Sequence, residues 1–302
     1  MTTKMILYFG LLLATLLITA LLAWQAWKQR GVAGSRHYFW LALAMSAAAL
    51  GEILSVLSPS EALASFWFKA RFLPFAVIPP LWLLFVLKYS GRKDLVPRGF
   101  EIGLMIVPFV TQVMVWTGSL HTLWVQQDVG FQQVGPFWMA DISRRIPGIW
   151  YLVHTFYGQL LLLAGSVLLL RTAWSTMRRF RLQAALLAAS ALVPLIVNVV
   201  VTLSVLPPDA INPTMPSFAL AALLVAAAIF RFDFLKRTPQ QVGEPDTQAE
   251  VEDKRSQAWF LLIFILLLVG LSAAGFVSYQ EYATQFRNQL DEKLTAIAAL
   301  KT

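Results

Sequence analysis

The stretch MILYFGLLLATLLITALLAW (residues 5–24) contains no charged side chain, and it decides the fold class. A helix of this length rises about 30 Å, which matches the hydrocarbon core of a bilayer. Because that core offers no water to backbone N–H and C=O groups, a crossing segment must satisfy them internally, as a helix. Lys28, Arg30 and Arg36 follow the stretch, and they predict an uncleaved anchor whose N-terminus lies outside the cytoplasm.

Seven further apolar blocks follow. Apolar residues make up 58% of the 302 residues and charged residues 13%, against about half and about a quarter in a soluble domain. The sequence therefore predicts an all-α integral membrane protein: a seven-helix bundle with its N-terminus outside, then a cytoplasmic linker and an eighth transmembrane helix. We place the spans at 5–27, 38–57, 66–88, 99–118, 148–171, 183–206, 213–232 and 258–278.

Positive charge is distributed unevenly between the connections. Sixteen Lys and Arg residues follow the first, third, fifth and seventh spans, whereas six lie on the opposite side. Because cytoplasmic loops are rich in Lys and Arg, the first side is predicted to be cytoplasmic. The net charge of +8 does not indicate a nucleic-acid partner, since the cations flank apolar blocks and the expected surroundings are the lipid bilayer. On the outer side, only the stretch 119–147 is long enough to hold structure of its own.

A polar linker divides the chain. Residues 238–257 are rich in Pro, Gly, Gln and acidic residues, which is typical of a flexible segment. Residues 1–237 then form a seven-helix membrane domain, and residues 258–278 form the eighth span. The external residues 279–302 are predicted to be an amphipathic helix, whose stripe would be buried by a coiled coil in a homodimer or by a further sensor domain. The stripe consists of Phe286, Leu290, Leu294, Ile297 and Leu300. Because it is unfinished at residue 302, the pattern favours a further sensor domain over a coiled coil.

Ionisable side chains inside predicted spans are costly to bury and are the first candidates for function. Glu52 lies roughly 9 Å from the outer end of the second span. Lys69 and Arg71 enter the third span from the same side at a similar depth. We expect an intramembrane ion pair between Glu52 and these cations. A role of Glu52 in binding a ligand or a proton is the alternative.

Catalytic and metal-binding patterns are absent from the sequence. The three histidines, His37, His121 and His154, have no second histidine or carboxylate at the spacing of a metal site. There is no cysteine, no Gly-rich phosphate loop and no nucleophile elbow. We therefore expect no enzymatic activity, no metal and no cofactor in these residues.

A series of landmarks resembles a known family. Their order and spacing are similar to those of the N-terminal seven-helix sensory region of bacterial histidine kinases and of some diguanylate cyclases. The landmarks are ASFWFKARFLPF (64–75), PPLWLLFVLKYSG (79–91), SLHTLW (119–124), GPFW (135–138), RLQA (181–184), Pro194, Asn198, PTMPSF (213–218) and RFDFLK (231–236).

The resemblance implies a signal-input module of a two-component-type receptor in the bacterial inner membrane. The segment 135–138 and His121 match the most recognisable external features of the family, whereas Val134 replaces its usual tyrosine. The eighth span is a second departure, because a cytoplasmic signalling domain commonly follows the seventh. We hypothesise that a pocket near the outer face binds an unknown signal through Arg71, His121, Trp138 and His154.

Two other functions remain open. A small-solute transporter would carry substrate across the bilayer, but the two halves of the chain show no repeat and no matched pair of interrupted spans. A stand-alone membrane partner protein is compatible with the composition alone.

Overall fold

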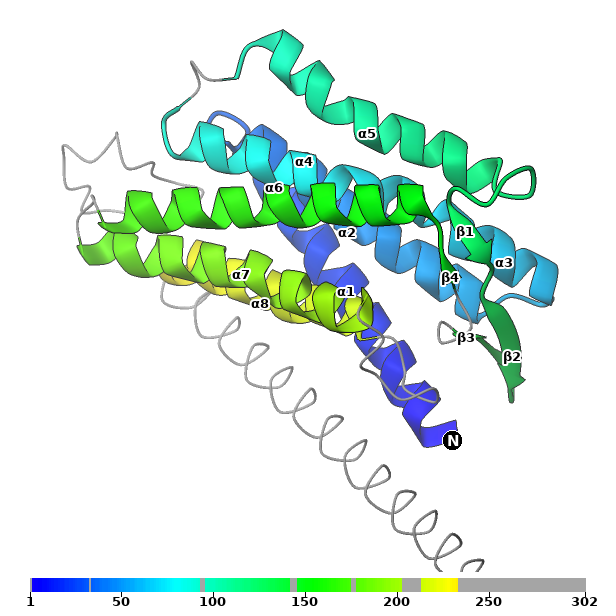
Figure 1. Cartoon of the computed structure of the whole chain (residues 1–302). Helices are drawn as coiled ribbons and strands as arrows, with labels where there is room; N and C mark the ends of the chain where they lie inside the picture. Colours follow the sequence, from blue (N-terminus) through cyan, green and yellow to red (C-terminus); the bar gives the residue numbers. More distant parts are fainter. Residues whose placement is uncertain are drawn as a thin grey trace, which may run out of the picture.

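The computed structural model of the chain describes residues 2–32, 34–92, 96–141, 146–174, 178–202 and 213–232 (Figure 1). The predicted linker (238–257), the eighth span (258–278) and the external helix (279–302) lie outside the described residues. The described residues form mostly helices, which are α1 (Thr2–Lys28), α2 (Ser35–Val56), α3 (Glu61–Ala70), α4 (Phe72–Tyr89), α5 (Arg98–Trp116), α6 (Ile149–Trp174), α7 (Arg178–Thr202) and α8 (Thr214–Phe232).

Seven helical units match the seven predicted spans of the membrane domain. Five of them, namely α1, α2, α3 with α4, α5, and α6, are long and apolar enough to cross a membrane. The other two, α7 and α8, contain shorter apolar stretches, Leu182–Asn198 and Pro216–Ala228. The expected mostly helical, multi-pass architecture is confirmed, whereas its orientation and the eighth span stay predictions.

The third predicted span consists of two helices that meet at Arg71. Pro74 lies in the first turn of α4, where its ring is tolerated, but it lacks the N–H that would bond to the carbonyl of Ala70. The backbone of Arg71 keeps right-handed helical angles, with φ −63° and ψ −19°. α3 and α4 therefore form one apolar span, and Arg71 lies at the junction between the two helices.

Six helical neighbours close a ring. In sequence around it, α1 packs on α2, α2 on α4, α4 on α6, α6 on α7, α7 on α8, and α8 returns to α1. The remaining long helix, α5, lies outside this ring against α4 and α6, as Figure 1 shows. Side chains that are completely buried at the centre come from opposite parts of the ring: Leu12, Phe85, Leu169 and Leu187.

The outer connection contains strands, so the all-α prediction is wrong for this segment. β2 (Gly130–Val134) pairs with β3 (Phe137–Asp141), and β1 (Val125–Gln127) pairs with β4 (Ile146–Pro147), both antiparallel. Gly135 turns β2 into β3 with a φ of 61°, a left-handed angle that suits the first position of a two-residue hairpin turn. The short strands could not be separated from loop because their apolar alternation spans only a few residues.

The two ends of the bundle differ in structure. The C-terminal ends of α4 and α6 and the N-terminal ends of α5 and α7 lie at one end, and both small sheets lie at the other (Figure 1). The first end carries Lys88, Arg98 and Arg171. This charged end is the one that the Lys and Arg distribution predicts to face the cytoplasm.

Candidate ligand-binding site

A buried polar cluster connects three helices at the sheet-bearing end of the bundle. The Arg71 guanidinium pairs with the Glu52 carboxylate through Nη1 and Oε2, and the Tyr8 hydroxyl donates to Glu52 Oε1 at 2.7 Å. The three residues are only 5–6% exposed. A Cβ at Gly51 would lie 3.0 Å from the Arg71 Cβ, so glycine allows the close approach of α2 to the α3–α4 junction.

Aromatic rings surround the Arg71 guanidinium. Its central carbon lies 3.8 Å from the centroid of the Phe68 ring, 5.8 Å from that of Phe72 and 6.0 Å from that of Phe75. Such ring faces attract a cation, and they add to the ion pair in offsetting the cost of removing a guanidinium from water.

Lys69, the other cation considered for the Glu52 pair, has a different partner. Its Nζ lies 3.4 Å from Asp128 Oδ2, and both side chains are well exposed, at 37% and 50%. The structure therefore separates Lys69 from the buried cluster by turning it toward the outer connection, although only two positions separate it from Arg71.

An outer cavity of about 140 Å³ opens beside Arg71. α4, α6, α7 and α8 contribute its walls, and all the contributing segments lie toward the sheet-bearing end. Its polar lining includes Arg71, His154, Thr155, Gln159, Asn198 and Thr214, and its aromatic lining includes Phe72, Phe75, Tyr151 and Phe218.

Hydrogen bonds to Thr111 hold His154 at the wall of the outer cavity. The Thr111 hydroxyl donates to the Val107 carbonyl at 2.8 Å and accepts from Trp150 Nε1 at 3.1 Å. His154 Nδ1 lies 3.1 Å from the same oxygen. A hydroxyl has only one proton, so when Thr111 donates it over the shorter distance to Val107, His154 Nδ1 is the donor to Thr111 and Nε2 of a neutral ring is an acceptor.

His121 and Trp138 are not brought to the outer cavity. The His121 ring closes the turn after α5: Nε2 lies 2.9 Å from Thr117 Oγ1, and Nδ1 accepts from the Leu123 N–H at 3.2 Å. Trp138 lies in β3 opposite Gln133. Its neighbours Phe137 and Met139 pack against the bundle core, so the alternation of a strand directs Trp138 to the other face. Of the four hypothesised binding residues, the structure gathers Arg71 and His154.

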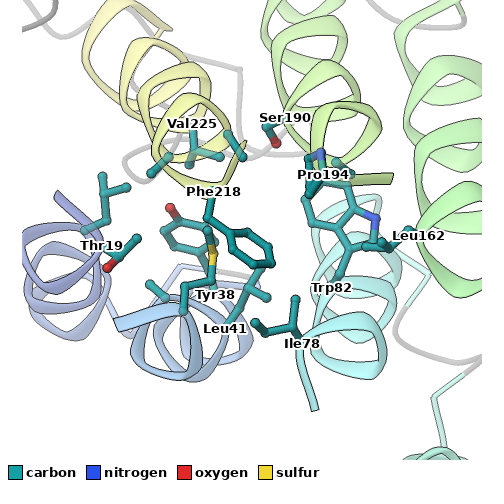
Figure 2. Close-up of a pocket in the computed structure, with 16 residues that line it drawn as sticks. Thr19, Tyr38, Leu41, Ile78, Trp82, Leu162, Ser190, Pro194, Phe218 and Val225 are labelled. Atoms are coloured by element: carbon teal, nitrogen blue, oxygen red, sulfur yellow. The ribbon is translucent and has the colours of Figure 1, made fainter. Parts of the chain in front are cut away.

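An inner, almost wholly apolar cavity of about 40 Å³ lies deeper in the ring. Figure 2 shows the Phe218 ring near the centre of its lining, which also includes Tyr38, Trp82 and Ser190. Four residues line both cavities: Ile78, Leu162, Pro194 and Phe218. Within the described part of the chain, no group of three His, Asp or Glu side chains gathers in a way that could hold a metal ion.

A family model described as the N-terminal 7TM region of histidine kinase matches residues 11–239. The chain belongs to this family. The match includes the helical units from α2 to α8 and most of α1, and it confirms the resemblance drawn from the landmark segments. None of the curated proteins compared matches the chain.

Several landmark segments of this 7TM region contribute residues to the outer cavity, whereas segments 119–124, 135–138, 181–184 and 231–236 contribute none of the described lining. Segment 64–75 contributes Arg71, Phe72 and Phe75, segment 79–91 contributes Pro79, and segment 213–218 contributes Thr214 and Phe218, beside Pro194 and Asn198. Sequence reasoning did not identify Tyr8, Thr111 or Phe218 as members of the site. A hydroxyl within an apolar span was the signal available for Tyr8 and Thr111, whereas Phe218 resembled any other apolar residue.

Proposed function

We propose that the chain is the signal-input module of a two-component-type receptor, a sensor histidine kinase or a diguanylate cyclase, in the bacterial inner membrane. The observation that carries the proposal is that landmarks 64–75, 79–91 and 213–218, with Pro194 and Asn198, line one cavity with a polar and an aromatic wall. Pockets between the helices of a bundle, with a few polar groups on an apolar lining, are common ligand sites.

Orientation is the second part of the proposal. With its Lys-rich and Arg-rich end in the cytoplasm, the module has its N-terminus, both sheets and the outer cavity toward the external side. A signal molecule would then reach the cavity from outside or from the outer leaflet, and the chain after α8 would continue into the cytoplasm.

Ligand binding would act by selecting one packing of the helices. A ligand can shift such an equilibrium only through different affinities for the two states. Arg71 and Phe218 supply the connection: Arg71 joins the cavity to α1 and α2 through Glu52 and Tyr8, and Phe218 belongs to α8, which leads to the predicted linker. The signal would thus pass toward the cytoplasm from Arg71 and Phe218, which line the outer cavity.

A phosphorylation assay on the complete gene product tests this function. Membranes that contain it are incubated with radiolabelled ATP, or with GTP to detect cyclic dinucleotide synthesis, and compared with a version that lacks residues 1–237. An input module predicts that the deletion changes the rate of product formation severalfold, and the active substrate tells kinase from cyclase. No product from either nucleotide, together with solute uptake by proteoliposomes, would favour a transporter.

A further inference from the structure

We propose that the outer cavity binds a small uncharged molecule with a ring-sized apolar body and one group that both donates and accepts a hydrogen bond, such as an aromatic alcohol or amide. The inference rests on the proposed input function and names the class of signal. It follows from the charge, the hydrogen-bonding groups and the size of the cavity.

The charge of the wall favours an uncharged guest. Among the described residues that line the outer cavity, Arg71 is the only Lys, Arg, Asp or Glu, and the Glu52 carboxylate already pairs with it. An anion bound here would bring a second negative charge, beside that of Glu52, to one guanidinium in a largely buried region, and a cation would meet an arginine. Burying a charge that is not balanced costs several kcal/mol, so an uncharged molecule binds at least cost.

The hydrogen-bonding groups of the cavity favour a guest that has both a hydrogen-bond donor and an acceptor. With the Thr111 proton on its 2.8 Å bond to Val107, His154 Nδ1 donates to Thr111 and Nε2 is the acceptor of a neutral ring. Arg71 has N–H donors and no acceptor. A hydroxyl or a primary amide can donate to His154 and accept from Arg71 or Gln159, whereas an ionised carboxylate has no proton for His154.

The size and lining of the cavity fit a ring. Its volume of about 140 Å³ is close to the roughly 150 Å³ of an apolar cavity that holds benzene. Phe72, Phe75 and Phe218 provide ring faces and edges for stacked or edge-to-face contacts. Phe218 lines both this space and the inner cavity, so the guest contacts a side chain of α8 that borders both.

Binding of three probes of equal ring size tests the ligand class. The full chain in lipid nanodiscs is titrated with radiolabelled benzyl alcohol, benzoate and toluene, and the signal of empty nanodiscs is subtracted to remove partition into lipid. We expect saturable binding of benzyl alcohol that is at least about tenfold tighter than that of benzoate or toluene. Saturable benzoate binding of equal or greater strength would overturn the proposal.

Two variants assign the binding to this cavity. His154→Phe keeps a ring but removes the acceptor, and it should abolish the preference for benzyl alcohol over toluene. Phe218→Ala removes the shared wall and should admit the larger probe 2-naphthalenemethanol, whereas Phe156→Ala, at a position 68% exposed on α6, should admit only benzyl alcohol. An unchanged preference in His154→Phe would contradict the assignment. Absence of saturable binding by any probe would overturn the ligand class, while the phosphorylation assay would still decide the input function.

Discussion

Arg71 and Lys69 are basic residues two positions apart, and their surroundings give them different energetic weights. Arg71 is 5% exposed and, together with Tyr8, binds the buried carboxylate of Glu52. Lys69 instead forms an ion pair in which both side chains are solvent-exposed. Exposed pairs contribute about 0–1 kcal/mol. A buried pair contributes little beyond an apolar substitute, but removing one partner leaves the other charge buried.

Arg71→Met should therefore lower the free energy of unfolding by about 3–5 kcal/mol. The reason is that the Glu52 carboxylate would keep only the Tyr8 hydroxyl of the two polar partners that it has in the described structure. Lys69→Met is the matched control and should change it by less than about 1 kcal/mol. Unfolding of the purified protein in detergent measures both. The double variant with Glu52→Gln should recover part of the loss, and equal effects of the two single variants would contradict the buried pair.

Gly165 is a second residue whose surroundings lead to a prediction. A Cβ at this position would lie 2.4 Å from Trp82 Nε1 and 2.9 Å from Trp82 Cδ1, and Trp82 is only 3% exposed. Gly165→Ala should displace the indole, which lines the inner cavity, and lower the free energy of unfolding by about 1–3 kcal/mol.

Gly10→Ala is the control for that substitution, because no atom lies within 4 Å of a Cβ built at Gly10. There alanine should be neutral or should stabilise α1 by up to about 1 kcal/mol, since glycine is the poorer helix former. Thermal unfolding of the two variants side by side gives the comparison. A Gly165→Ala protein as stable as the Gly10→Ala protein would show that Trp82 can move at no cost.

Among the elements, α5 lies outside the helical ring, and side-chain hydrogen bonds connect it to α4 and α6. Gln112 Nε2 donates to the Phe72 carbonyl at 2.9 Å, and the Tyr157 hydroxyl donates to the Leu104 carbonyl at 2.7 Å. At the charged end, Glu101 Oε1 lies 2.6 Å from Lys88 Nζ. Thr111 is the residue through which α5 contacts two side chains of α6, those of His154 and Trp150.

Thr111→Val keeps the shape of the side chain and removes its hydroxyl, so α5 should separate more readily from α6. Interhelical hydrogen bonds in membrane proteins average about 0.6 kcal/mol each, which predicts a loss of about 1 kcal/mol for the two. Hydrogen exchange in peptides from α5 should become faster. Thr117→Val serves as the control, since the hydrogen bonds of its hydroxyl within the described residues are to Val113 and His121, near the end of the same helix. Equal exchange in the two variants would oppose this role of Thr111.

At the scale of the whole molecule, the predicted orientation can be tested by labelling because the chain contains no cysteine. Gln132→Cys places one exposed thiol on β2 at the sheet-bearing end, and Arg92→Cys places one after α4 at the charged end. In spheroplasts, a maleimide that cannot cross membranes should label Gln132→Cys at once and Arg92→Cys only after lysis. The reverse pattern would invert the topology and place the outer cavity toward the cytoplasm.

The elements that depend on local composition can be predicted from the amino-acid sequence. Apolar blocks such as residues 5–24 specify membrane spans because each helix satisfies its own backbone in lipid, and the landmark segments placed the chain in the 7TM family. Membrane spans and family membership can be predicted in this way because they depend only on the residues within one segment or on the order of segments along the chain. The break at Arg71 also has a local cause, because Pro74 lacks the N–H that would bond to the carbonyl of Ala70.

Contacts between side chains of different helices, in contrast, follow from how the helices pack. Whether Glu52 contacts Arg71 or Lys69 depends on how α2 and the α3–α4 junction are rotated about their axes, and no local pattern records that rotation. The outer cavity requires α4, α6, α7 and α8 to be neighbours, which follows from closure of the ring. His121 and Trp138 were hypothesised to join this site because they share its end of the bundle. The turn after α5 and the alternation of β3 direct them elsewhere, since a side chain's direction is set by the backbone that carries it.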